Sequence, residues 1–283
     1  MATALVGVRG AGDLATGVIH RLRRAGFQVV ATELPQPTVL RRPVAFASAV
    51  WEGRMEVEEV TAVRVDGRDQ VAAALGRGQV AILVDPGAEL LRGLRPQVLV
   101  DATMVKRNCG TLRADAPAVI ALGPGFTAGD DVDAVIETNR GHDLGRVLLQ
   151  GTALADTGIP APVGGHAAER VLRAPRAGRF LGCQRIGETV AAGAAVATVD
   201  GEPVISGVAG ILRGLLHDGV EVTPNMKVGD VDPRAIPSHC FTISDKARAV
   251  GGGVLEAILM LSPQAAGGGT GPLAAAAGSG PGC

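Results

Sequence analysis

The stretch that decides the expected fold is Leu5-Val-Gly-Val-Arg-Gly10-Ala-Gly12-Asp-Leu-Ala15. Apolar residues then recur at helical spacing, at Leu14, Val18, Ile19 and Leu22. The stretch therefore predicts a strand, a tight glycine turn and a helix. Its G-x-G-x-x-A spacing is typical of loops that bind dinucleotides. In such a loop Gly10 permits the turn, Gly12 lets the backbone approach a phosphate, and Ala15 allows close packing of the helix on the strand.

Two acidic residues accompany this loop. Glu33 ends the next apolar run, about 20 residues beyond the glycines, where an acid that binds a ribose hydroxyl is expected. Asp13 lies inside the loop, where a carboxylate beside a phosphate is unfavourable unless it is paired. The glycine spacing and the position of Glu33 together predict nucleotide binding at Gly10, Gly12, Asp13, Ala15 and Glu33. The alternative is that the glycines serve only packing.

The first part of the chain, residues 1–145, alternates short apolar runs with helical stretches, which predicts parallel strands buried on both faces. The expected strands are Leu5–Arg9, Gln28–Thr32, Val80–Val84, Val98–Asp101 and Ala118–Leu122. This pattern predicts an α/β fold with a Rossmann-like doubly wound parallel sheet.

The remaining chain changes character. Residues 146–238 are short Val-rich segments punctuated by Gly and Pro, with two half-repeats, and predict a small all-β domain resembling a barrel-sandwich hybrid. Biotinyl and lipoyl carriers of that type present a Lys on the turn between the halves. The corresponding turn, Asp200–Pro203, has none, so neither covalent group is expected. Residues 239–262 are expected to form a loop and a helix, and 263–283 a disordered Gly/Ala/Pro tail.

A second group of polar and glycine residues follows later strands of the first domain. Lys106 is a candidate catalytic residue that Asp101 and Asn108 could orient. It stands beyond the strand ending at Asp101, where ligands of open α/β sheets bind, and a solvated loop rim is the alternative. A second glycine loop and a polar run come after the next strand. We expect them to complete a ligand crevice, through Gly123, Gly125, Gly129, Arg140 and His142. His142 alone is more typical of an ordinary surface histidine.

The third group lies near the C-terminal end. Cys240, Asp245 and Lys246 are candidate catalytic residues, and His239 beside Cys240 could lower the pKa of the thiol. The alternative for Cys240 is a buried packing thiol. Two potential ligands are too few for zinc, so no metal site is expected. The triplet Gly251-Gly-Gly253 is expected to be a loop that leads into a helix over residues 254–261.

Composition excludes several classes of function. Hydrophobic residues make up 47% of the chain and the net charge is −1, which predicts a core-forming protein without an electrostatic drive toward nucleic acid or anionic membranes. Aromatic residues are 2%, too few for base stacking. The four cysteines lack a CxxC spacing, and no apolar run is long enough to span a membrane. With no signal peptide expected, a cytoplasmic location is predicted.

Four stretches together resemble one family. They are Val8-Arg-Gly-Ala-Gly-Asp-Leu-Ala-Thr-Gly17, Gly123-Pro-Gly-Phe-Thr-Ala-Gly129 with Glu137-Thr-Asn-Arg-Gly-His142, Lys227-Val-Gly-Asp-Val-Asp-Pro-Arg234, and Cys240-Phe-Thr-Ile-Ser-Asp-Lys-Ala-Arg248. They resemble the selenium-dependent molybdenum hydroxylase system proteins of the YqeB family, over about residues 3–261. The first domain is similar in kind to the Rossmann domain of xanthine dehydrogenase accessory proteins, which assist maturation of the molybdenum cofactor.

The resemblance implies an accessory or maturation factor, not the hydroxylase itself. Its ligand would be a nucleotide or a molybdopterin-type cofactor, and its partners a molybdenum hydroxylase or cofactor-maturation proteins. Two alternatives stay open. One is an NAD(P)-dependent oxidoreductase, which the absence of any Tyr weakens. The other is a non-enzymatic scaffold whose all-β domain docks a hydroxylase.

Overall fold

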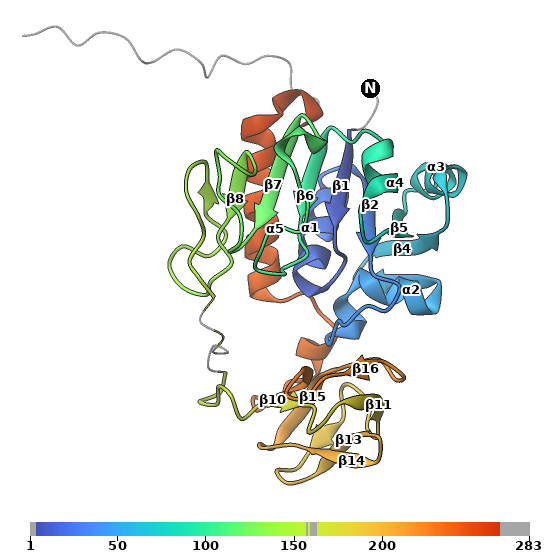
Figure 1. Ribbon diagram of the computed structural model, residues 1–283, viewed down its shortest axis with the longest axis vertical. Helices are drawn as coiled ribbons and strands as arrows, with labels where there is room; N and C mark the ends of the chain where they lie inside the picture. The colour runs from blue at the N-terminus through green and yellow to red at the C-terminus, as the bar shows by residue number, and fades with distance from the viewer. Residues whose placement is uncertain (1–3, 157, 159–162, 267–283) are drawn as a thin grey trace, which may run out of the picture.

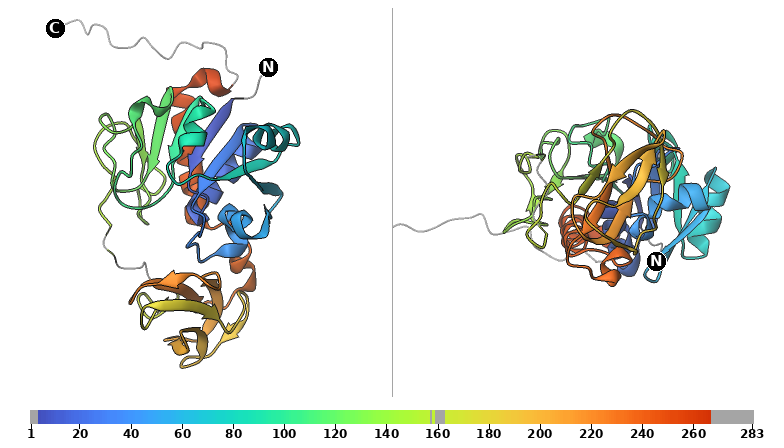
Figure 2. Two further views of the ribbon diagram at one scale, coloured as in Figure 1. Left: turned by 45° about the vertical axis from the view of Figure 1, so that its right-hand side comes forward. Right: turned by 90° about the horizontal axis from the view of Figure 1, so that it is seen from below.

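The computed structural model describes residues 4–156, 158 and 163–266. It has a large sheet covered by helices and a smaller β-rich unit at one end of that sheet (Figure 1). The chain passes from the large sheet into the β-rich unit after β9 and returns through an orange segment that leads into α5 (Figures 1 and 2). None of the helices in the described part of the chain is long and apolar enough to cross a membrane.

Within the described residues, nine strands form the large sheet, in the order β3-β4-β5-β2-β1-β6-β7-β8-β9. Their bounds are β1 Leu5–Arg9, β2 Gln28–Glu33, β3 Arg54–Val57, β4 Val60–Val65, β5 Val80–Val84, β6 Val98–Asp101, β7 Ala118–Leu122, β8 Ala134–Ile136 and β9 Val147–Leu148. The strands from β4 to β8 along this order are parallel, whereas β3 and β9 are antiparallel to their neighbours.

The expectation of a Rossmann-like doubly wound parallel sheet is therefore wrong. The sheet is mixed. In one half of it, the connections between parallel strands contain no crossover α-helix. The connections β6–β7 and β7–β8 contain only the short 3-10 helix Arg113–Asp115, because residues 102–117 and 123–133 otherwise run as turns and loops. Loop side chains such as Phe126 and Val132 cover that half of one face in place of crossover helices.

Helices cover the rest of the sheet. Their bounds are α1 Asp13–Arg24, α2 Ala49–Glu52, α3 Arg68–Gly76, α4 Glu89–Gly93 and α5 Asp245–Leu261. Shorter 3-10 turns are Arg42–Val44, Phe46–Ser48, Pro237–Cys240 and Pro263–Ala266. Strand side chains alternate between the faces. Val6 and Val8 pack with α1 and α5, whereas Val30 and Leu99 pack on the side of α3 and α4.

The expected start of the C-terminal helix is also wrong. The helix α5 starts at Asp245, not after the glycines, and the Ser244 side chain caps it by accepting a hydrogen bond from the N–H of Ala247 at 3.2 Å. Gly251 and Gly253 lie inside the helix where other backbone segments approach closely, whereas a Cβ at Gly252 would meet no described atom within 4 Å. A Cβ at Gly251 would lie 2.6 Å from the carbonyl oxygen of Gly17 on α1, and one at Gly253 would lie 2.2 Å from that of Gly145. Close helix packing thus outweighs their low helix propensity.

The β-rich unit consists of two four-stranded sheets among the described residues, ordered β10-β17-β15-β12 and β14-β13-β11-β16, with antiparallel pairing. The bounds are β10 Val171–Arg173, β11 Gly178–Gly182, β12 Thr189–Val190, β13 Ala195–Val199, β14 Glu202–Ile205, β15 Gly210–Leu215, β16 Glu221–Val222 and β17 Lys227–Asp232. Phe180 and Leu212 are among the fully buried side chains between them.

The segment after β2 joins the two units. The N–H of Leu215 donates to the Leu40 carbonyl at 2.9 Å, and the Arg42 side chain donates to the Leu215 carbonyl at 2.9 Å. The rings of Trp51 and His217 stack at a centroid distance of 4.2 Å. These contacts fix the β-rich unit against the end of the large sheet.

Candidate functional site

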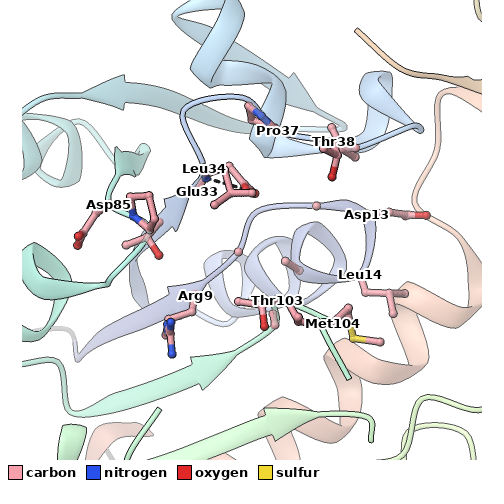
Figure 3. Close-up of a pocket in the computed structure, with 18 residues that line it drawn as sticks. Arg9, Asp13, Leu14, Glu33, Leu34, Pro37, Thr38, Asp85, Thr103 and Met104 are labelled. Carbon is pink, nitrogen blue, oxygen red and sulfur yellow. Dashed lines mark hydrogen bonds between the residues drawn. The ribbon is translucent and has the colours of Figure 1, made fainter. Parts of the chain in front are cut away.

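A cavity of about 400 Å³ opens at the carboxyl ends of β1, β2, β5 and β6 (Figure 3). Here β2 lies on one side of β1 and β6 on the other, so the chain continues from β1 into both halves of the sheet. Open α/β sheets bind ligands at such a position. The lining comes from four places in the chain: residues 9–15, 32–39, 85–86 and 102–105.

The first glycine loop forms one wall of the cavity. Gly10 has a φ of +90°, which an L side chain rarely adopts, and a Cβ there would touch the Ala102 carbonyl oxygen at 3.0 Å. Gly12 precedes α1 with φ −70° and ψ −168°, which any residue can adopt. Among the described residues, nothing lies within 4 Å of a Cβ built at Gly12. Ala15 is buried against the sheet. The loop therefore leaves open space where Gly12 borders the cavity.

Glu33 stands at the end of β2 and turns back toward the glycine loop (Figure 3). Its carboxylate accepts hydrogen bonds from the N–H groups of Ala11 and Leu34, at 2.9 and 2.8 Å. Burial raises the pKa of the carboxyl and outweighs these two hydrogen bonds, which lower it. A carboxylate has about four acceptor positions, so Glu33 can still accept from a ligand hydroxyl.

Asp13 forms an ion pair, so its carboxylate does not stand as an unpaired negative charge in this loop. The Nη1 of Arg41 donates to both carboxylate oxygens at 2.9 and 3.0 Å. The Nη2 of the same guanidinium donates to the carbonyl oxygens of His239 and Thr242, both at 2.9 Å. Arg41 is buried and cancels the charge of Asp13, so the loop does not repel an anion through this side chain.

Sequence reasoning missed Arg9 as a residue of the cavity. Arg9 is buried at the end of β1, with Nη1 3.3 Å from the Asp101 carboxylate and Nη2 donating to the Cys109 carbonyl at 3.2 Å. It also donates to Thr111, whose hydroxyl donates to Asp101 at 2.6 Å. The signal in the sequence was a charged residue that closes an otherwise apolar strand directly before the glycine turn.

The second glycine loop lies behind the cavity instead of lining it. Met104 lines the cavity, and its Cε would lie 3.4 Å from a Cβ at Gly123. Gly125 packs against the backbone of Lys106 and Arg107, at 2.4 Å from a Cβ position, and Gly129 has a φ of +94° in the turn that follows. The two loops therefore do not face one shared space in this structure.

Lys106 points to a different partner from the one expected. Its ammonium pairs with the carboxylate of Asp156, and about half of the lysine side chain is exposed. Asp101 and Asn108, which sequence reasoning offered as orienting groups, bond elsewhere: Asp101 accepts from Thr103 and Asn108 donates to the Thr111 carbonyl.

Arg140 and Asp245 meet although they are far apart in the sequence. The guanidinium donates from Nη1 and Nη2 to the two carboxylate oxygens, at 2.7 and 2.8 Å. These hydrogen bonds hold the pKa of Asp245 far below its usual range. Lys246 is half-buried, and desolvation lowers the pKa of its ammonium. His142 is exposed on the surface.

Cys240 is fully buried at the end of the 3-10 turn Pro237–Cys240. Its thiol lies 3.8 Å from the Leu212 carbonyl, and burial raises the pKa of the thiol although Arg213 and Arg41 oppose the shift. This direction is opposite to the one that a reactive thiolate needs.

No family model matches this sequence. Similar solved structures include an aspartoacylase family protein from Mesorhizobium loti, with 13% identity and a TM-score of 0.28 over 82% of this chain and 85% of that one. The ectoine utilization protein EutE (DoeB) from Ruegeria pomeroyi has 11% identity and a TM-score of 0.24 over 81% and 85% of the two chains. TM-scores this low transfer neither a fold nor an activity.

The sequence identity to one known protein is much higher. A protein of Escherichia coli K12 named "Uncharacterized protein YqeB" is 47% identical over 260 residues, which are 92% of this chain and 48% of that protein. The chain thus spans about half the length of this relative. Over the 260 residues that the two proteins share, this similarity supports a relationship to YqeB.

Proposed function

We propose that the cavity binds a nucleotide, or the nucleotide part of a molybdenum cofactor, and that the protein is an accessory factor for a selenium-dependent molybdenum hydroxylase. The observation that carries the proposal is the cavity itself. It lies at the carboxyl ends of parallel strands, with the glycine loop and the N-terminus of α1 on one side and Glu33 on the other.

The chemistry of the lining suits a nucleotide. The first turn of α1 carries backbone N–H groups and the positive end of the helix dipole, which favour a phosphate. Asp13 does not oppose a phosphate there, because Arg41 neutralises it. Glu33 offers acceptors for ribose hydroxyls. A volume of about 400 Å³ is near the lower end of small-molecule sites, roughly 300–1,000 Å³, and favours a mononucleotide over a complete dinucleotide.

The link to a molybdenum hydroxylase rests on the four sequence stretches that resemble the selenium-dependent molybdenum hydroxylase system proteins. Two of these stretches meet in the fold, since Arg140 of the second binds Asp245 of the fourth. The first and fourth also meet, because Arg41 links Asp13 to the carbonyl of Thr242. Three of the four stretches, the first, second and fourth, are therefore linked in the fold, which supports one shared role for them.

The second candidate is an NAD(P)-dependent oxidoreductase, favoured by the same glycine loop with Glu33. The titratable side chains that line the cavity are Arg9, Asp13, Glu33 and Asp85. Asp85 accepts from the N–H groups of Glu89 and Leu91 and holds the start of α4. The described lining thus offers carboxylates but no tyrosine, lysine or histidine as a proton donor to a carbonyl substrate, which makes this candidate the weaker one.

The deciding experiment is mass spectrometry of small molecules released from freshly purified protein, followed by calorimetry with AMP, CMP and NAD. Release of a pterin nucleotide, or binding of AMP or CMP more tightly than NAD, supports the proposal. Release of a nicotinamide dinucleotide supports the oxidoreductase. If nothing is released and none of the three nucleotides binds, the cavity is not a nucleotide site and the scaffold role remains.

A further inference from the structure

We propose that His20, Glu58 and Glu59 form a binding site for a divalent transition-metal ion of the zinc class, separate from the nucleotide cavity. His20 lies in the middle of α1, and the two glutamates form the two-residue turn between β3 and β4. The turn places both carboxylates against the same side of α1. Imidazole nitrogen and carboxylate oxygen together are a common ligand set for such ions.

The two distances from His20 match a tetrahedral ion. The Nε2 of His20 lies 3.3 Å from Oε2 of Glu58 and 3.4 Å from Oε1 of Glu59. The three ligand atoms all lie within 4.8 Å of one another. Around a zinc ion with bonds of about 2.0–2.1 Å, neighbouring ligand atoms of a regular tetrahedron are separated by about 3.3–3.4 Å.

The environment of His20 is the second, independent observation. Its side chain is 5% exposed, and within the described part of the chain its Nε2 makes no hydrogen bond of acceptable geometry. Buried polar atoms are nearly always hydrogen-bonded, so an exception calls for a physical cause. The unbonded nitrogen lies 3.3 and 3.4 Å from two carboxylate oxygens, and a cation coordinated by all three atoms supplies that cause.

Neighbouring groups orient the glutamates. Oε1 of Glu58 accepts from the Arg248 guanidinium at 2.5 Å and from the N–H of Ile243 at 3.1 Å, which leaves Oε2 to face His20. Such outer contacts fix the orientation of metal ligands. Glu59 is 57% exposed at the side chain, so a fourth position is open to water. Arg24, with Nε 3.3 Å from Oε1 of Glu59, competes with the metal for this oxygen and lowers its affinity.

The proposal predicts a specific dependence on Glu59. Metal-free protein, with Cys109, Cys183 and Cys283 replaced by Ser to remove competing thiols, is titrated with ZnCl₂ by calorimetry and with CoCl₂ by visible absorption. We expect one equivalent of Zn²⁺ to bind, and Co²⁺ to give the strong visible bands of a tetrahedral ion. Glu59→Gln should weaken Zn²⁺ binding at least tenfold. Zn²⁺ should also raise the Tm of the parent protein but not that of Glu59→Gln.

The matched control is Glu56→Gln on the same hairpin. Glu56 is also 57% exposed at its side chain and pairs with an arginine, Arg54, at 3.1 Å, but it does not face His20. This variant should bind Zn²⁺ like the parent protein.

Equal loss of affinity in both variants would mean that surface charge alone attracts the ion, and would overturn the site. Absence of stoichiometric Zn²⁺ binding in the parent protein would overturn it too, leaving His20 as an ion-pair partner of the two glutamates. The nucleotide proposal stands or falls separately, because its assays contain no metal.

Discussion

Arg41 and Asp13 form an ion pair in which Nη1 lies 2.9 and 3.0 Å from the two carboxylate oxygens, and this pair joins the glycine loop to the C-terminal segment. The rest of the guanidinium is bonded to the carbonyls of His239 and Thr242, directly before α5. The sequence alone predicts that the glycine loop and the C-terminal segment belong to different parts of the chain, residues 1–145 and 239–262. The pair therefore couples the shape of the cavity wall to the docking of α5.

Replacing Arg41 should test this coupling. Arg41→Met leaves the Asp13 carboxylate and two carbonyls without their donor, and we expect a loss of about 3 kcal/mol in the free energy of unfolding. Urea denaturation measures it. The double variant Arg41→Met/Asp13→Asn should recover part of the loss, because no unpaired charge remains. Strictly additive losses in the double variant would show that the pair does not couple the two segments.

A side chain at Gly12 should block the cavity without straining the backbone. The backbone angles of Gly12 suit any residue and the space around its Cβ is open, so Gly12→Val should fold normally and place two methyl groups in the cavity. We expect nucleotide affinity by calorimetry to fall at least tenfold, about 1.4 kcal/mol. Gly67→Val is the matched control.

Gly67 is matched because it also precedes a helix, α3, with an extended backbone and no described atom within 4 Å of its Cβ position, but it lies away from the cavity. It should bind nucleotide like the parent protein. If Gly12→Val binds as tightly as Gly67→Val, the ligand does not approach this part of the loop.

The ion pair between Arg140 and Asp245 predicts a pH-dependent effect. Arg140→Gln removes the two hydrogen bonds that depress the pKa of Asp245, so carbon-13 NMR should find a pKa well below the ordinary value of about 3.9 in the parent protein and near it in the variant. A carboxyl whose pKa is lowered by folding stabilises the protein above its unfolded pKa and loses that contribution as pH falls.

The variant should therefore be less stable at neutral pH, and the difference should shrink below about pH 4. Because the Asp245 side chain is 71% exposed, the difference should stay within about 1 kcal/mol. A gap that widens toward acidic pH would contradict the assignment. Arg146→Gln, which breaks an exposed pair with Asp143 elsewhere on the surface, is the control and should leave the Asp245 titration unchanged.

The five apolar runs that the sequence singled out do form β1, β2, β5, β6 and β7, because buried parallel strands leave a strong local signal. The edge strands leave a weaker signal than a continuous apolar run. The hairpin of β3 and β4 carries polar side chains in alternation, and β8 has only three residues. The start of α5 could not be predicted either, since Gly251 is required by the approach of α1 and Gly253 by the approach of Gly145, both far earlier in the chain.

The residues of the candidate site also fall into those that the sequence predicts and those that it does not. Gly10, Gly12 and Glu33 could be predicted from spacing, because a strand, a turn and a helix that follow one another fix their relative positions. The partner of Asp13 could not, since Arg41 reaches it only after the segment following β2 has packed against the β-rich unit. Likewise, nothing in the local sequence places His20 beside a hairpin turn that begins almost 40 residues later.

Cys240 should behave as a packing thiol. It is fully buried, and burial raises the pKa of its thiol, so both access and thiolate formation are suppressed in the folded protein. In a variant whose other cysteines, Cys109, Cys183 and Cys283, are replaced by Ser, iodoacetamide should fail to modify Cys240 until denaturant unfolds the chain. The matched control keeps Cys183, which is exposed, as its single cysteine and should react at the rate of an ordinary thiol.

Rapid modification of native Cys240, with an apparent pKa below about 8.5, would instead mean that the 3-10 turn opens and that Arg41 and Arg213 stabilise a thiolate there. Sulfur or selenium chemistry at this residue would then become a candidate activity. Protection equal to the unfolding free energy would leave the nucleotide cavity and the His20 cluster as the places to look for chemistry.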